Sequence, residues 1–177
     1  MSPPQLALKP EASAEVMPTP ERSVGGKFEA NFARIEDELG NPAVAGMLED
    51  LREHDPTTFK HVLGVSLYAA KMLEIFEDQI PLTDSETASF MRAGLLHDTG
   101  KLDISTEILE KPGGLTDEEF SEVKAHTMRG YEILRGNKDF SSDQLLLNLT
   151  LLHHQVQRKK YVRDDMADWI VGKDKER

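Results

Sequence analysis

Apolar residues recur at helical spacing along most of the chain from residue 27 onward. Residues 27–39 place Phe28, Phe32, Ile35 and Leu39 at intervals of three or four, which is typical of an amphipathic helix. The same spacing predicts further helices at 43–54, 56–77, 84–98, 117–135 and 142–160. No segment shows the strict alternation of a strand. The sequence therefore predicts an all-α, multi-helix bundle.

Capping residues mark where several of these helices begin. Asp55 and Pro56 are expected to be an N-cap and a first helical position. Capping boxes are expected at 83–86 (Thr-Asp-Ser-Glu) and 116–119 (Thr-Asp-Glu-Glu). The stretch 61–70 carries no charged residue, so we expect its helix to be buried on most of its circumference.

The first 26 residues have a different composition. They hold five of the nine prolines and end in Gly25 and Gly26. Such a segment buries too little apolar surface to order itself, so residues 1–26 are interpreted as a disordered tail or linker. A short docking peptide is the alternative. The helical domain is expected to span residues 27–177.

The overall composition excludes several classes of protein. There is no apolar run of roughly 18 residues and no secretory signal pattern, so we expect a cytoplasmic protein without a membrane segment. The absence of cysteine excludes disulfides and thiolate metal sites. A net charge of −11 argues against binding polymeric nucleic acid. It leaves a small phosphorylated substrate open, because bound cations can invert the local field.

The histidines are the candidate chemistry. Five of the six lie in apolar helical sequence: His61, His97, His126, His153 and His154. Asp98 follows directly after one of them, and buried imidazole and carboxylate are unfavourable unless a metal ion offsets their desolvation. A single such histidine is more often a core residue, but five together favour a metal centre. Without cysteine, the ligand set suits Zn, Mn, Fe or Ni. The sixth, His54, is interpreted as a surface residue at a helix end.

The pair His97 and Asp98 constrains the local backbone. Adjacent residues on a continuous helix point about 100° apart, so both can face one ion only where the helix ends. Gly100 is expected to end it as a left-handed C′ residue. Lys101 then lies beyond the helix, where it either reaches a substrate phosphate or stabilises the helix C-terminus.

At this point the residues resemble a known family. Residues 96–101 (Leu-His-Asp-Thr-Gly-Lys), 108–119 (Ile-Leu-Glu-Lys-Pro-Gly-Gly-Leu-Thr-Asp-Glu-Glu) and 126–134 (His-Thr-Met-Arg-Gly-Tyr-Glu-Ile-Leu) are similar to the HD superfamily of metal-dependent phosphohydrolases. They resemble most its HD-GYP branch, whose characterised activity is hydrolysis of cyclic di-GMP. The resemblance covers roughly residues 57–156. It implies an HD-type bundle that hydrolyses a phosphodiester of cyclic di-GMP or a related nucleotide at two divalent transition-metal ions.

The resemblance also implies roles for individual residues. The implied metal ligands are His61, His97, Asp98, His126, His153, His154 and Asp168. Asp98 is expected to bridge the two ions, and Lys101 to lie near the substrate phosphate; these two are the implied catalytic residues. Asp164 and Asp165 are the alternatives to Asp168.

The chain departs from the family pattern in three places. The His-His-Glu of the family is His153, His154 and Gln155 here, and residues 157–161 (Gln-Arg-Lys-Lys-Tyr) replace the Gly-Tyr-Pro segment. Thr57 stands where some members carry a glutamate for a third metal, which implies two metals at most. These departures favour an alternative: a catalytically degenerate HD module that binds a nucleotide or a partner protein in signalling.

Overall fold

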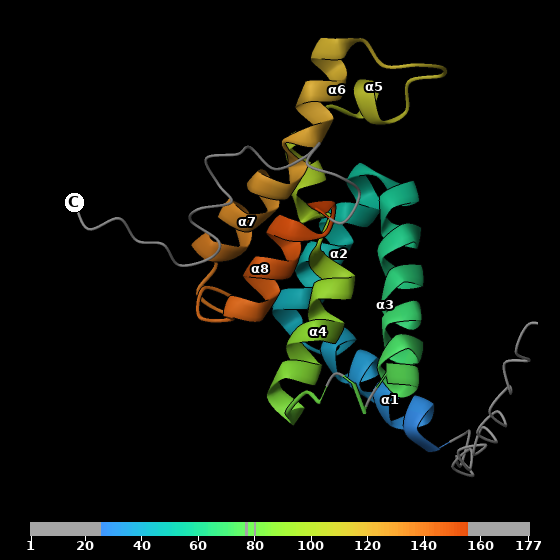
Figure 1. Ribbon diagram of the computed structural model, residues 1–177. Coiled ribbons are helices and arrows are strands. Elements are labelled where there is room, and N and C mark those ends of the chain that lie inside the picture. Colours follow the sequence, from blue (N-terminus) through green and yellow to red (C-terminus); the bar gives the residue numbers. More distant parts are fainter. Residues whose placement is uncertain (1–25, 77, 80, 156–177) are drawn as a thin grey trace, which may run out of the picture.

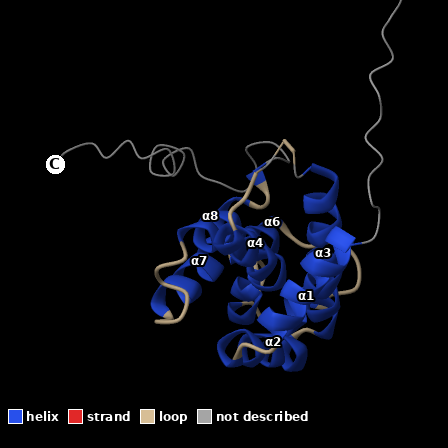
Figure 2. Ribbon diagram, turned by 90° about the horizontal axis from the view of Figure 1, so that it is seen from below, coloured by secondary structure: helices blue, strands red, loops and turns tan. Residues whose placement is uncertain are grey.

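The structure, a computed structural model, describes residues 26–76, 78–79 and 81–155. Every regular element in these ranges is helical, as Figure 2 shows, so the all-α prediction is confirmed for the part of the chain described. The elements are α1 (Gly26–Leu39), α2 (Pro42–His54), α3 (Pro56–Phe76), α4 (Asp84–Leu96), the 3₁₀ helix η1 (Thr99–Asp103), α5 (Thr106–Leu109), α6 (Asp117–Lys124), α7 (His126–Gly136) and α8 (Gln144–Leu152).

The predicted helix starts are present. Helix α3 begins at Pro56, and the Asp55 carboxylate accepts the Thr57 backbone N–H at 2.9 Å. The capping boxes at 83–86 and 116–119 both form, with side chain and backbone bonded in each direction. Because side chains satisfy the first backbone donors, these ends are set by local sequence.

Helix α4 lies between α3 and α8, and η1 packs against α7 (Figure 1). One continuous apolar core joins α1, α2, α3, α4, α7 and α8. The short α5 and α6 stand apart from this bundle, at the top of Figure 1. None of the described helices combines the length and apolar character needed to cross a bilayer.

A half-buried arginine ties three helices together. Arg92 on α4 donates to both carboxylate oxygens of Glu38 on α1, at 2.7 Å each. It also donates to Asp143, the N-cap residue of α8, at 2.6 Å. This network holds α8, which carries two of the candidate ligands at its end, in register with α4. The hydrophobic pattern gave no sign of it.

Two helices are shorter than the sequence predicted. The expected helix at 117–135 is two helices, because Ala125 bonds back to Glu122 and Val123 and breaks the α-helical ladder. The expected helix at 142–160 ends at Leu152, and residues 153–154 form a turn. Both breaks coincide with histidines. Residues 156–160 lie outside the described residues.

The prediction that α3 is buried on most of its circumference was wrong. Its buried residues lie on one face, at Thr58, Val62, Ser66, Ala70 and Leu73. Several other apolar side chains of the helix are exposed: Leu67, Tyr68, Met72, Ile75 and Phe76. The absence of charged residues from 61–70 was therefore not a sign that this helix is buried. Gly26, expected in the tail, is the first residue of α1, and the rest of that segment lies outside the described residues.

Candidate metal centre

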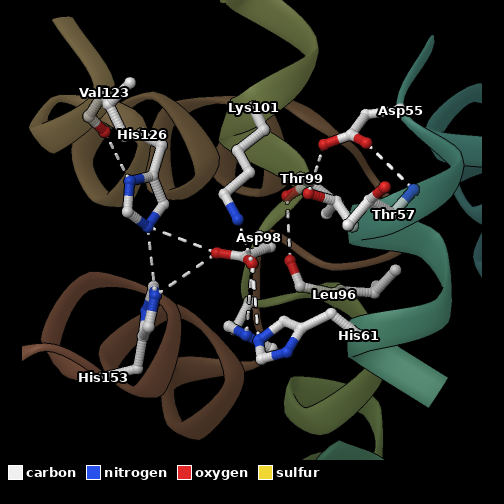
Figure 3. Close-up of polar contacts among 12 residues, drawn as sticks. Asp55, Thr57, His61, Leu96, Asp98, Thr99, Lys101, Val123, His126 and His153 are labelled. Atoms are coloured by element: carbon white, nitrogen blue, oxygen red, sulfur yellow. Dashed lines mark hydrogen bonds and ion pairs between the residues drawn. The ribbon is translucent and has the colours of Figure 1, made fainter. Parts of the chain in front are cut away.

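The centre is built at the end of α4. Leu95 and Leu96 in the last turn are fully buried, and His97 is the C-cap residue. Asp98 follows between α4 and η1 with a side chain only 3% exposed. The helix therefore ends before the pair, as the sequence required if both residues face one site. Figure 3 shows the Asp98 carboxylate at the centre of the surrounding imidazoles.

The expected role of Gly100 was wrong. Gly113 is the one glycine with a positive φ among the described residues, whereas Gly100 lies inside η1. A Cβ on Gly100 would lie 1.9 Å from the His126 carbonyl oxygen and 2.4 Å from the Gly130 nitrogen. Glycine is required here because the backbones of η1 and α7 approach too closely for any side chain. This contact places His126, the first residue of α7, beside Asp98.

Lys101 is placed by the 3₁₀ helix. Residues three apart eclipse each other in this conformation, and the Lys101 backbone N–H bonds to the Asp98 carbonyl at 2.9 Å. The Lys101 ammonium consequently lies 2.8 Å from Oδ2 of Asp98. Sequence reasoning proposed a phosphate contact or a helix-end charge, and it missed this ion pair.

The histidines divide between the two oxygens of Asp98. Oδ1 lies 3.2 Å from Nε2 of His126 and 3.5 Å from Nε2 of His153. Oδ2 lies 3.6 Å from Nε2 of His97 and 3.8 Å from Nε2 of His61. We call these groups the Oδ1 side and the Oδ2 side. Two sets of possible ligand atoms result, each within 4.8 Å of one another: Asp98, His126, His153 and His154, and His61, His97 and Asp98.

The structure thus brings together all the predicted ligands that it describes. Five histidines from α3, α4, α7 and α8 gather around one carboxylate. Asp168 and its alternatives Asp164 and Asp165 lie outside the described residues, so a ligand from that segment stays a prediction.

Three of the rings are oriented by backbone carbonyls. In His97, His126 and His153, Nδ1 bonds to the carbonyl oxygen three residues earlier; the acceptors are Gly94 at 3.1 Å, Val123 at 2.6 Å and Thr150 at 2.8 Å. A carbonyl only accepts, so each Nδ1 carries the hydrogen and each Nε2 presents a lone pair toward Asp98. These acceptors lie in the last turns of α4, α6 and α8, whose carbonyls are not taken up by a continuing α-helical ladder. Sequence reasoning missed them, although each histidine stands just past a helix end.

Burial and neighbouring charge keep the centre in a ligand-ready state. Burial lowers the pKa of His97 from 6.5 to about 4, and the Asp98 carboxylate opposes this only partly. Burial, with His153 and His126 adding to it, lowers the pKa of His154 to about 4. Burial alone would raise the pKa of Asp98, but its polar neighbours, the Lys101 ammonium among them, outweigh burial and hold that pKa well below its usual range.

The buried donor atoms fit a divalent cation. Oδ1 of Asp98 has no hydrogen-bond partner within the described residues, although two imidazole nitrogens lie near it. Nε2 of His126 and Nε2 of His153 are 3.2 Å apart, and with both Nδ1 atoms protonated neither can donate to the other. Three lone-pair atoms therefore converge in a buried space. A cation is the group that such a donor set accommodates.

Solvent reaches the centre from the Oδ2 side. The His61 side chain is 53% exposed and that of Lys101 is 20% exposed. A cavity of about 320 Å³ also borders three of the rings, and its walls are largely apolar. Its lining residues are Val65, Ala69, Phe90, Ala93, Gly94, His97, Leu149, His153 and His154.

His54 is not the free surface residue that its position suggested. Its ring is half-buried, and its Nε2 lies 2.7 Å from the carbonyl oxygen of Ile104. Ile104 is the C-cap residue of η1, so this contact ties the end of α2 to the segment that carries Lys101. His54 supports the centre without facing it.

Comparison with known proteins agrees with this geometry. The HD domain family model matches residues 58–174. A cyclic di-GMP phosphodiesterase of Pseudomonas aeruginosa is 34% identical over 117 residues, which are 66% of this chain and 27% of that protein. A cyclic di-GMP phosphodiesterase response regulator of Xanthomonas campestris is 31% identical over 112 residues, 62% of this chain and 28% of that protein.

A third relative acts on a different dinucleotide. A 3'3'-cGAMP-specific phosphodiesterase of Vibrio cholerae is 33% identical over 100 residues, 56% of this chain and 20% of that protein. The chain therefore spans less than a third of the length of each of these relatives.

Proposed function

The chain belongs to the HD domain family, and we propose that it is a metal-dependent phosphodiesterase that hydrolyses a cyclic dinucleotide. The observation that carries the proposal is the Asp98 carboxylate, buried among five histidines with three Nε2 lone pairs turned toward it. The relatives named for cyclic di-GMP and for 3'3'-cGAMP support the substrate class.

The arrangement of the donors supports two ions, one at each oxygen of Asp98. The Oδ1 side would use His126, His153 and His154, and the Oδ2 side would use His61 and His97. Imidazole and carboxylate donors suit Fe, Mn, Zn or Ni. Bound divalent ions would supply an acidified water and would neutralise charge that develops on the phosphoryl oxygens.

The remaining chemistry belongs to the chain itself. Asp98, ionised at neutral pH, uses its two oxygens to hold both sides at a fixed separation. The carbonyls of Gly94, Val123 and Thr150 keep the three rings in the tautomer that leaves Nε2 free. The phosphodiester would enter from the Oδ2 side, where His61 and Lys101 reach solvent. Lys101 there provides a positive charge for an anionic substrate.

A direct assay tests this function. The protein is loaded with Mn²⁺, Fe²⁺ or Zn²⁺, and hydrolysis of cyclic di-GMP and of 3'3'-cGAMP is followed by chromatography of the products. We expect turnover of at least one dinucleotide, and loss of at least a hundredfold in Asp98→Asn. Protein that takes up metal but hydrolyses neither dinucleotide would refute the proposed activity.

A second candidate function is a module that binds a cyclic dinucleotide without turnover. Gln155, half-buried directly after His154, favours it, because an amide cannot supply the carboxylate that the family pattern has there. This candidate predicts binding of cyclic di-GMP by calorimetry with no product after prolonged incubation. Conversion in Gln155→Glu but not in the natural sequence would decide for it.

The proposals about cellular context come from the sequence alone. A reducing cytoplasm suits a chain without cysteine, and the acidic charge argues against polymeric nucleic acid as a partner. A protein partner in signalling is proposed on the family resemblance. Fractionation of cells that express the tagged chain tests the location.

A further inference from the structure

We propose that Lys101 sets the order in which the two sides of the centre take up metal. An ion on the Oδ2 side must displace the Lys101 ammonium from Asp98, so the Oδ1 side fills first. This inference rests on the proposed metal centre. The positions of the ligands alone do not predict which side binds metal more tightly, whereas Lys101 makes the two affinities differ.

Positive charge is distributed unevenly around Asp98. The Lys101 ammonium lies 2.8 Å from Oδ2, closer than Nε2 of His97 at 3.6 Å or Nε2 of His61 at 3.8 Å. On the Oδ1 side, the groups that approach Asp98 are the imidazoles of His126 and His153. The Lys101 ammonium therefore lies where an ion would approach Oδ2, and among the described residues no such charge lies beside Oδ1.

The Lys101 ammonium also repels a divalent ion on the Oδ2 side. A lysine ammonium is a compact charge, and a divalent ion bound at the same oxygen would lie a few ångströms from it. Charges that close repel strongly at a site shielded from water, and Asp98 is 3% exposed. Either the ammonium moves or the ion binds weakly, and both reduce affinity on the Oδ2 side.

The Lys101 ammonium can move. The Lys101 side chain is 20% exposed and sits at the solvent-facing edge of the centre. Its backbone is held by the bond to the Asp98 carbonyl at 2.9 Å and by the packing of Gly100 on α7. Displacement therefore needs rotation of one flexible side chain and no change in the fold.

Metal titration of the full chain tests the proposal. Metal-free protein is titrated with Mn²⁺ in a calorimeter, and the two binding constants are compared with those of Lys101→Met, which keeps the aliphatic stem without the charge. We expect the weaker constant to strengthen on the order of tenfold and the stronger to stay within about twofold. Lys111→Met is the matched control, because Lys111 pairs with Glu119 instead.

The outcomes separate cleanly. One Mn²⁺ per natural chain but two per Lys101→Met chain also supports the proposal. Unchanged binding constants in Lys101→Met overturn the proposal. Weaker Mn²⁺ binding in the variant also overturns it, and would make Lys101 a residue that positions the carboxylate. If Lys101→Met fails to fold, Lys101→Gln replaces it under the same criteria. A natural chain that binds no ion defeats the proposed metal centre itself, a result distinct from these.

Discussion

The Oδ1 and Oδ2 sides of Asp98 hold their histidines in different ways. On the Oδ1 side, His126 and His153 both stand at helix ends, and each ring is fixed by a carbonyl left over from the last helical turn. On the Oδ2 side, His97 is held in the same manner, but His61 lies within α3 and is half-exposed. The two sides share a carboxylate but differ in rigidity and charge.

The difference shows what a helix end contributes to a metal ligand. Inside a helix each carbonyl already accepts a backbone N–H, so none is available to orient the ring of His61. At a C-terminus the carbonyls are free, and an imidazole a few residues later can use one. Oriented ligands lose less freedom when an ion binds. We therefore expect the Oδ1 side to bind metal more tightly, before the charge of Lys101 is considered.

Removing the shared carboxylate should have the largest effect on the two sides. Asp98→Asn should abolish metal uptake on both sides, because an amide supplies one weak donor oxygen in place of two charged ones. Elemental analysis after loading with Mn²⁺ and desalting measures it. Asp103→Asn, an exposed carboxylate on η1, is the control and should keep the natural metal content. If Asp98→Asn retains one tightly bound ion per folded chain, the shared-carboxylate arrangement is wrong.

Gly100→Ala should damage the Oδ1 side through the fold. The new Cβ would collide with the His126 carbonyl oxygen at 1.9 Å, so η1 and α7 must separate. We expect destabilisation on the order of 3–5 kcal/mol, measured by urea unfolding of the metal-free protein. Gly46→Ala in α2 is the matched control, because nothing lies within 4 Å of that Cβ. It should stabilise by up to about 1 kcal/mol. Equal effects of the two substitutions would contradict the close-contact explanation.

Local patterns predicted most of the helices, and together with the family resemblance they identified the histidines of the candidate site. Helical spacing and capping boxes placed α3, α4 and the start of α6, since these signals lie within a few residues of each end. Apolar surroundings and the family resemblance identified the histidines that meet at Asp98. Helical spacing and caps depend on nearby residues, whereas the resemblance depends on motifs spread over residues 57–156.

Features that depend on contacts between distant segments were not predictable in this way. Gly100 looked like a helix-ending residue, but its function is the approach of η1 to α7, which no local pattern contains. The break at Ala125 was hidden because the residues on both sides favour helix. The bonds from Arg92 to Glu38 and Asp143 join residues more than 50 positions apart.

Acid should destabilise the metal-free protein through the buried rings. The pKa of His97 is about 4 in the folded protein against 6.5 for the free side chain, so between these values only the unfolded chain binds the proton. Stability is therefore full above about pH 6.5 and falls as the pH drops toward 4. The fall for His97 alone should reach about 3 kcal/mol. Urea unfolding at pH 7, 6 and 5 measures it.

Two variants assign this pH dependence. His97→Gln should reduce the fall between pH 6.5 and 5, because one of the two rings with a lowered pKa is gone while the other, His154, remains. His61→Ala should retain most of the fall, because the buried ring of His97 is still present. A fall that persists unaltered in His97→Gln would place its origin elsewhere.

The smallest expected effects come from removing one histidine from each side of Asp98. His61→Ala should weaken only the looser Mn²⁺ constant, on the order of tenfold, since one of the Oδ2-side nitrogens is lost. His153→Ala should instead weaken the tighter constant, because its ring is oriented by Thr150 toward Oδ1. Calorimetry on both variants resolves the two constants.

Stability provides the independent readout for this pair. His61→Ala should change the free energy of unfolding by less than about 0.5 kcal/mol, because the side chain is half-exposed on a helix. His153→Ala removes a ring that packs against His126 and His154, so it should destabilise by more. If both variants weaken the same constant, the ions do not divide between the oxygens of Asp98. The two sides would then form one site, with His61 and His153 as ligands of a single ion.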